Sequence, residues 1–290
     1  MKKKSIRTNG INLAVYETGS DGTPIVLLHP GGIFGSYVWE QIFSRLSVSY
    51  RVIAIDIRGH GYSDHPMSGY EFNNLSIDIL GIFDELNIQR AHIIGNSLGA
   101  EIGLVFASNF PERMLSLVQI DGGIINYLGP NGELEGTKEE LVSVRLNRPI
   151  REFSSREEFN YFAKENFAAF DPIIEHIPLR ILPNGMLTFQ QDNQIAAELL
   201  ASGCDLDMLA LYKKASCPVL FFPAEKEPKL DVKLLAIDKI RSYLPACKTV
   251  IIPNSTHIMM IQHSAEICEE IEIFIMDSSF QDSKNSFHHS

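Results

Sequence analysis

The chain has 290 residues, enough for one large α/β domain or two small ones, and its 45% hydrophobic fraction is typical of a folded globular protein. With 25 Lys and Arg against 36 Asp and Glu, the net charge of −11 disfavours a nucleic-acid partner, which would favour a basic face. No run reaches transmembrane length, and no apolar signal-peptide core follows Lys2–Lys4, so we expect a cytoplasmic protein with no membrane partner. Four cysteines lack metal or disulfide spacing and are expected to be free thiols: Cys204, Cys217, Cys247 and Cys268.

Apolar runs and helix-like stretches alternate through the first 123 residues. A hairpin signal at Asn9-Gly10 joins two predicted strands, Lys4–Thr8 and Ile11–Glu17. Further strands are predicted at Ile25–Leu28, Val52–Ile55, Ala91–Ile94 and Leu115–Ile120, and helices at Val38–Leu46, Leu75–Leu86 and Ala100–Ser108. This alternation predicts an α/β fold with a mostly parallel, doubly wound sheet and helices on both faces.

The alternation stops after residue 123 and resumes at residue 215. Helices are predicted between these points at Thr137–Leu146, Ser154–Phe170 and Asp192–Leu211, and the first two begin with N-cap residues. We therefore expect residues 124–214 to form a helical lid over the carboxyl edge of the sheet.

The last part of the chain returns to the alternating pattern. Strands are predicted at Pro218–Phe222 and Thr249–Ile252, and helices at Val232–Tyr243 and Ala265–Ile275. Residues 1–123 and 215–276 are expected to form one core domain, and residues 277–290 a polar, frayed tail.

The strongest motif is Gly95-Asn96-Ser97-Leu98-Gly99, which lies between a predicted strand and a predicted helix. This context is what a nucleophile elbow requires, because a serine on a sharp turn points its hydroxyl away from the sheet. Glycines relieve crowding at such a turn, and the helix start after Ser97 offers backbone N–H groups to an oxyanion.

Four predicted strand ends carry polar groups that could act together. They are His29-Pro30-Gly31-Gly32, Ser97, the acids Glu225 and Glu227, and His257. The chain order serine, acid, histidine is that of the α/β-hydrolase superfamily. Together with the segments Asp56–Asp64 and Pro218–Pro228, these motifs make the sequence resemble that superfamily over nearly the whole chain.

The resemblance implies a catalytic triad without metal or cofactor. Ser97 would be the nucleophile, His257 the base and Glu227 the acid, with Asp121 as the main rival acid and Glu225 and Asp231 behind it. Three other histidines compete with His257 less well because they lie in motifs or loops read as structural: His29, His60 and His65.

The oxyanion would be held by two backbone N–H groups. One is expected from Leu98 and the other from Gly31, with Gly32 as the alternative, because Pro30 has no N–H to donate.

We expect a serine hydrolase that cleaves an ester, lactone or similar acyl bond of a small molecule. Three alternatives stay open: a carbon–carbon bond hydrolase, an acyltransferase, and a binding protein on the same fold. A haloalkane dehalogenase is disfavoured because that relative uses an aspartate where this chain has Ser97. The sequence names neither the substrate nor the oligomeric state.

Overall fold

The computed structural model describes residues 2–19, 21–167, 173–189 and 191–286. Its main sheet, within the described residues, has eight strands in the order β1-β2-β4-β3-β5-β6-β9-β10. β1 pairs antiparallel with β2, and β2 pairs antiparallel with β4, whereas all the other neighbours are parallel. The strands are β1 (Lys2–Thr8), β2 (Ile11–Glu17), β3 (Pro24–Leu28), β4 (Arg51–Ile55), β5 (Ala91–Asn96), β6 (Met114–Ile120), β9 (Val219–Phe222) and β10 (Cys247–Thr249).

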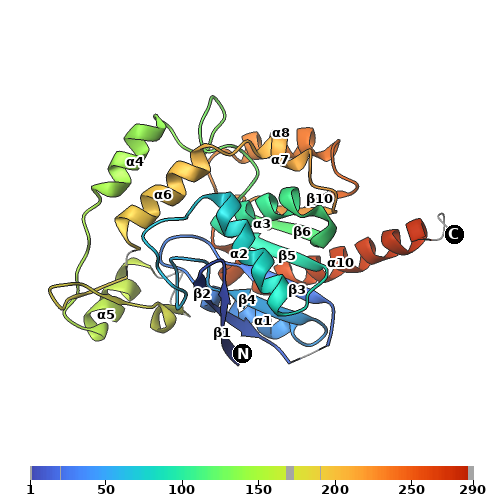
Figure 1. Ribbon diagram of the computed structural model, residues 1–290. Coiled ribbons are helices and arrows are strands. Elements are labelled where there is room, and N and C mark those ends of the chain that lie inside the picture. The colour runs from blue at the N-terminus through green and yellow to red at the C-terminus, as the bar shows by residue number, and fades with distance from the viewer. Residues whose placement is uncertain (1, 20, 168–172, 190, 287–290) are drawn as a thin grey trace.

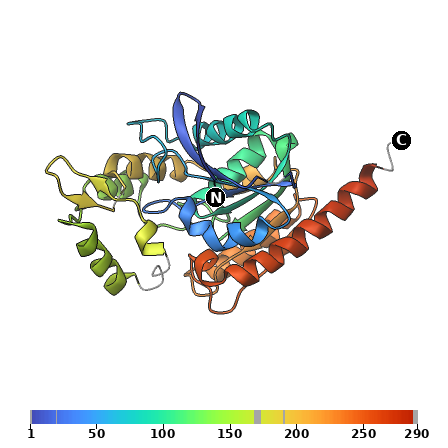
Figure 2. The same cartoon turned by 90° about the horizontal axis from the view of Figure 1, so that it is seen from below.

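Helices cover both faces of this sheet, as Figures 1 and 2 show. The side chains of β3 alternate between two cores: Val26 and Leu28 pack with α2 and α3, whereas Ile25 and Leu27 pack with α1 and α10. Successive strand residues point to opposite faces, so a run that is apolar throughout is buried on both sides. The helices of this part are α1 (Glu40–Leu46), α2 (Phe72–Glu85), α3 (Leu98–Asn109), α8 (Leu230–Arg241), α9 (Met259–Gln262) and α10 (Ser264–Ser286).

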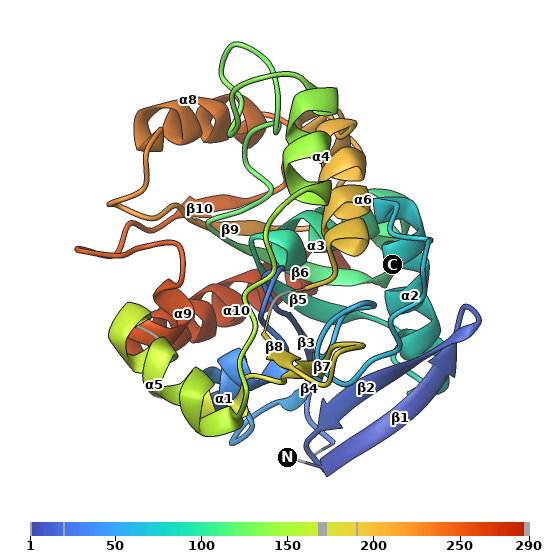
Figure 3. The ribbon, with the colours of Figure 1, turned by 90° about the vertical axis from the view of Figure 1, so that its left-hand side faces the viewer.

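Residues 124–214 interrupt the alternation of strands and helices, as predicted. Figure 3 shows α4 and α6 side by side, with α5 and the small β7–β8 hairpin farther along the same side of the sheet. The elements are α4 (Lys138–Leu146), α5 (Arg156–Asn166), β7 (Arg180–Ile181), β8 (Leu187–Thr188), α6 (Asn193–Cys204) and α7 (Met208–Tyr212).

The predicted N-caps of this segment are present. Thr137 forms a capping box with Glu140, and the Ser155 side chain accepts a hydrogen bond from the N–H of Glu158. The predicted helix at 192–211 is instead two helices, α6 and α7. The predicted helix at 154–170 ends at Asn166, and its positions 168–170 lie outside the described residues.

Two predictions near the C-terminus are wrong in their bounds. The last strand is Cys247–Thr249 rather than 249–252, because these three residues pair with Val219–Phe221 at the edge of the sheet. The tail predicted to be irregular from residue 277 is helical as far as Ser286, since α10 continues without a break. Among the described residues, no helix combines the length and apolarity needed to cross a membrane.

The strand order places five carboxyl ends next to one another, those of β3, β5, β6, β9 and β10. β4 lies on one side of β3 and β5 on the other, so the direction of winding reverses at β3. Loops at such a point separate and leave a crevice at the carboxyl edge of the sheet. The loops after β3, β5, β6, β9 and β10 carry residues of the candidate site.

Candidate active site

Ser97 lies on a strained turn between β5 and α3. Its backbone has φ 52° and ψ −121°, a conformation that non-glycine residues rarely adopt. A Cβ on Gly95 would lie 2.3 Å from the carbonyl oxygen of Gly99, and one on Gly99 would lie 2.1 Å from that of Leu28. The predicted elbow geometry is therefore confirmed, and both glycines are sterically required.

A third glycine supports the elbow from the neighbouring strand. A Cβ on Gly122, just after β6, would lie 2.6 Å from Cα of Ser97. The preceding residue, Asp121, has φ 43°. In the sequence this segment is mainly the end of a predicted strand, and only its two successive glycines, Gly122 and Gly123, indicate such close packing.

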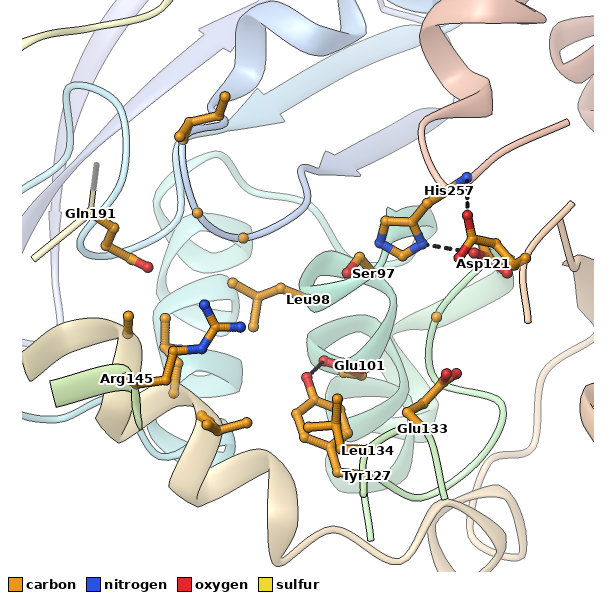
Figure 4. Close-up of a pocket in the computed structure, with 18 of the residues that line it drawn as sticks. Ser97, Leu98, Glu101, Asp121, Tyr127, Glu133, Leu134, Arg145, Gln191 and His257 are labelled. Carbon is orange, nitrogen blue, oxygen red and sulfur yellow. Dashed lines mark hydrogen bonds and ion pairs between the residues drawn. The ribbon is translucent and has the colours of Figure 1, made fainter. Parts of the chain in front are cut away.

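The carboxylate that faces the His257 ring belongs to Asp121, which corrects the choice of Glu227. Asp121 Oδ2 lies 2.7 Å from His257 Nδ1, whereas Glu227 Oε1 accepts a hydrogen bond of 3.2 Å from the backbone N–H of His257. Glu227 therefore helps to hold the loop, while Asp121 holds the imidazole (Figure 4). Both acids can approach His257 because β6 and β9 are adjacent and parallel.

The second oxygen of Asp121 is held by two donors. Oδ1 accepts 2.9 Å from Nζ of Lys233 and 3.1 Å from the N–H of Ala224. Lys233 is itself only 2% exposed, and its Nζ also lies 3.3 Å from Oε1 of Glu133. These bonds fix the carboxylate so that Oδ2 is left for His257. Lys233 was not predicted as a site residue, because in the sequence it is only one charged residue within the predicted helix at 232–243.

Burial and neighbouring charges act in opposite directions on the pKa values of Asp121 and His257. Burial raises the pKa of Asp121, but hydrogen bonding to His257 and the charge of Lys233 outweigh it and lower that pKa to about 2. Burial lowers the pKa of His257, but the hydrogen bond and charge of Asp121, assisted by Glu227, raise it above the ordinary value. Asp121 is thus ionised at neutral pH beside an imidazole that accepts a proton readily.

His257 is also held through its backbone, and its ring faces Ser97. The buried side chain of Asn96 donates to the carbonyl oxygens of Ile120 and His257, at 2.7 and 3.1 Å. Figure 4 shows the ring nitrogen opposite Asp121 directed towards Ser97. The three groups therefore lie in the order that proton transfer from serine to histidine requires.

The competing histidines have structural hydrogen bonds instead. His29 Nε2 accepts from the N–H of Ile57, and burial lowers the pKa of His29 to about 4. His60 bonds to Gln191, and burial lowers the pKa of His60 to about 3. Burial also lowers the pKa of His65, which bonds to the backbone near Gly61.

The two expected oxyanion donors border the same cavity as Ser97. Leu98 is the first residue of α3, where a helix has N–H groups without intrahelical partners. A Cβ on Gly31 would lie 3.2 Å from the Leu98 side chain, so the β3 loop passes close to the elbow. Gly32 also lines the cavity and has φ 84°. Gly31 and Leu98 remain the predicted donors.

A cavity of about 640 Å³ lies over Ser97. Ser97, Asp121 and His257 border it from the core of the fold. Residues 124–214 provide much of the rest of its lining: Tyr127, Glu133, Leu134, Arg145, Arg148, Phe189, Gln191, Ala196, Leu199 and Leu200. This size and mostly apolar lining suit a small organic molecule.

A buried carboxyl group forms part of this lining one helical turn after Ser97. Glu101 is 6% exposed, and its Oε2 accepts a hydrogen bond of 2.7 Å from the hydroxyl of Tyr127. Burial raises the pKa of Glu101 to about 7. This pair was not predicted from the sequence, because Glu101 lies within a predicted helix and Tyr127 is only one of many aromatic residues in the segment 124–214.

A metal ion would meet three possible ligands at this place. Single donor atoms of Asp121, Glu227 and His257 lie within 4.8 Å of one another. However, Asp121 and His257 already hydrogen-bond through Oδ2 and Nδ1, and Lys233 neutralises the same carboxylate. These contacts favour a hydrogen-bonded cluster over a metal centre.

The fold and site define a class of protein that comparison with known sequences identifies. Residues 24–264 match the model of the alpha/beta hydrolase fold, and the chain belongs to this family.

Individual relatives are enzymes named as hydrolases. A 2-(acetamidomethylene)succinate hydrolase from Mesorhizobium japonicum is 28% identical over 85% of both chains. A 2-hydroxy-6-oxononadienedioate/2-hydroxy-6-oxononatrienedioate hydrolase from Paraburkholderia phymatum is 34% identical over 42% of this chain and 44% of its own. Among solved structures, an E-2-(acetamidomethylene)succinate hydrolase superimposes with a TM-score of 0.76 and 26% identity, covering 94% of this chain and 98% of its own.

Proposed function

We propose that the protein is a serine hydrolase that cleaves an ester, lactone or similar acyl bond of a small molecule. The observation that carries the proposal is the hydrogen bond of 2.7 Å between Asp121 and His257 Nδ1, with Ser97 on the other side of the ring. The hydrolase names of the relatives support the reaction class.

In the proposed reaction, His257 Nε2 removes the proton of Ser97 as Oγ attacks the substrate carbonyl carbon. The N–H groups of Leu98 and Gly31 stabilise the oxyanion, and Asp121 stabilises the imidazolium. The imidazolium then protonates the leaving oxygen, and the bond from that oxygen to the acyl carbon breaks. Water, deprotonated by His257, releases the acid from the acyl-enzyme and restores Ser97.

We further propose that residues 124–214 act as the lid of this site. The support is the lining of the cavity, to which this segment contributes both apolar and charged side chains. A lid of this kind excludes water from the acyl-enzyme except for the attacking molecule and determines which substrates fit.

The test combines covalent labelling with turnover. A broad serine-directed fluorophosphonate should label the wild-type protein and not Ser97→Ala, and p-nitrophenyl esters and lactones should be hydrolysed by the wild type alone. Loss of Ser97 should reduce turnover about 10³-fold or more. Labelling at another residue, or equal turnover by both proteins, would overturn the proposal.

Hydrolysis of a carbon–carbon bond by the same residues is the second candidate. It is favoured by the relative from Paraburkholderia phymatum, whose named substrates contain a ketone and no ester. A 2-hydroxy-6-oxo-2,4-dienoate, followed by loss of its absorbance, belongs in the substrate panel. A higher kcat/KM for this compound than for every ester and lactone would favour the second candidate.

A further inference from the structure

Two arginines line the cavity, one in the last turn of α4 and one just after this helix, and neither is paired with an acidic side chain of the described residues. Arg145 and Arg148 both line it, and Figure 4 shows the Arg145 guanidinium directed inward, with Leu98 between it and Ser97. Within the described part of the chain, neither guanidinium has a hydrogen bond or ion pair, and the Nε of Arg148 is buried without an acceptor. A buried donor of this kind is costly unless a ligand satisfies it.

The usual structural use of arginine at a helix end does not apply to this pair. Arginine side chains often bind the free carbonyl groups of the last helical turn. Two of these groups in α4, the carbonyls of Ser143 and Leu146, are bonded by amide side chains, as is the carbonyl of Arg148 beyond the end of the helix. Asn147 donates to the carbonyl of Ser143 at 2.8 Å, and Asn193 donates to those of Leu146 and Arg148 at 3.2 and 2.8 Å. The guanidinium groups are therefore left for another partner.

The local charge contrasts with that of the whole protein. The chain carries a net charge of −11, yet two positive charges lie close together here. Burial lowers the pKa of Arg148, and the charge of Arg145 lowers it further. Arg148 is half-buried and Arg145 is exposed, and an anion bound between them would relieve both their mutual repulsion and the missing hydrogen bond of Arg148.

We infer that Arg145 and Arg148 form a subsite for a carboxylate group of the substrate, distant from the bond that is cleaved. This inference rests on the proposed hydrolase function. The planar guanidinium groups suit the two oxygens of a carboxylate. The apolar lining, which includes Leu98 and Leu199, suits a carbon chain between that carboxylate and Ser97. A doubly charged phosphate is disfavoured because four carboxyl groups line the same cavity: Glu101, Asp121, Glu133 and Glu227.

The test compares charged and neutral forms of the same substrate. One pair is mono-p-nitrophenyl adipate and its methyl ester, which differ at the far end of the acyl group. The other is 4-acetoxybenzoate and its methyl ester, which differ in the leaving group. In the wild type, kcat/KM should favour the charged member of at least one pair by tenfold or more.

Two variants and a matched control locate this preference. Arg145→Gln and Arg148→Gln should each reduce kcat/KM for the favoured anion by about 10- to 100-fold, the range for a charge-assisted hydrogen bond, and change that for its methyl ester less than about threefold. Arg151→Gln removes the same charge from the same segment, but this guanidinium lies over the ring of Phe162, 4.2 Å from its centre, and does not line the cavity. It should keep the preference.

The outcomes separate the subsite from a merely structural role. Arg145→Gln and Arg148→Gln should not lower Tm, since no hydrogen bond or ion pair with the described residues is lost, whereas a structural role would lower it. No charged preference in either pair, or an equal effect of Arg151→Gln, would overturn the inference. Inorganic phosphate that inhibited more strongly than adipate, with the same dependence on both arginines, would overturn the assignment to a carboxylate.

A final measurement separates this inference from the hydrolase proposal. Calorimetric titration of the wild type with adipate and with dimethyl adipate needs no turnover. If fluorophosphonate labelling fails but adipate binds at least tenfold more weakly to Arg148→Gln, the hydrolase proposal falls and the anion subsite stands. If labelling succeeds and adipate binds all variants equally, the hydrolase proposal stands and the anion subsite falls.

Discussion

The replacement of Asp121 by Asn tests the arrangement at the centre of the site. The Asn Oδ1 can still accept hydrogen bonds from Lys233 and Ala224, which now hold the corresponding oxygen. The Nδ2 amide would then face His257 Nδ1 in place of the present oxygen. In the wild type the carboxylate accepts a hydrogen bond from Nδ1–H of His257, whereas the Asn amide can only donate one. The neutral ring must then leave Nδ1 unprotonated and carry its proton on Nε2.

This change of tautomer should remove the base. A protonated Nε2 cannot accept the Ser97 proton, and the imidazolium also loses the negative charge that stabilises it. Both effects lower kcat/KM by about 10⁴-fold when the acid of a serine triad becomes an amide.

Stability should change much less than activity. The ammonium group of Lys233 is buried and loses one of its two carboxylate partners, but Glu133 remains at 3.3 Å. Breaking a buried ion pair completely costs about 3–5 kcal/mol, so we expect about 3 kcal/mol or less from urea unfolding.

Glu227→Gln is the matched control. Its amide oxygen can still accept from the His257 N–H, so only a charge near the ring is lost. We expect a reduction of kcat/KM of less than about tenfold, because one pKa unit corresponds to a tenfold change. Hydrolysis of p-nitrophenyl butyrate measures both variants. A nearly silent Asp121→Asn beside a crippling Glu227→Gln would refute this reasoning.

Four further predictions use the same residues. In a pH profile of kcat/KM, the fall on the acid side should have its midpoint above pH 6.5, because His257 must be neutral to act as base and its pKa is raised. A midpoint below pH 6 would contradict this. Lys233→Met should move the acid limb of the pH profile to higher pH, because the ammonium charge of Lys233 lowers the pKa of His257. The same variant should lower the free energy of unfolding in urea by about 3 kcal/mol, since a buried ion pair is broken. An acid limb at the wild-type pH would contradict this prediction. The pKa of Glu101 is raised to about 7, so the folded state holds this proton more strongly than the unfolded chain, and the free energy of unfolding should fall by about 3 kcal/mol as pH rises from about 4.5 to about 7. Glu101→Gln should remove this loss of stability, which thermal melts at pH 5 and pH 8 measure. An equal pH dependence of Tm in both proteins would refute the prediction. Gly122→Ala should lower both Tm and fluorophosphonate labelling, because its Cβ would lie 2.6 Å from Cα of Ser97, and a variant with normal labelling would contradict the close contact.

The sequence by itself determined the class of fold and the geometry of the elbow. Strands that are buried on both faces are apolar along their whole length, so β3, β4, β5 and β6 could be predicted from short local runs. The turn at Ser97 could be predicted for a partly similar reason, since Gly95 is required by its contact with Gly99 a few residues on, whereas Gly99 is required by the approach of Leu28, which only the tertiary structure shows.

Edge and terminal elements were less accurately predicted because their bounds depend on partners. β10 lies at the edge of the sheet, and its extent is set by pairing with β9 rather than by its own apolar pattern. The split of the 192–211 helix into α6 and α7, and the continuation of α10 to Ser286, likewise had no strong local signal.

Only the tertiary structure decided which acid meets His257. Asp121 and Glu227 follow adjacent parallel strands, so both reach the same loop, and sequence distance does not distinguish them. The decision depends on Lys233, 112 positions after Asp121, whose bond to Oδ1 orients the carboxylate. The anion subsite was equally invisible, because an arginine without a partner can be recognised only when the surroundings of its side chain are known.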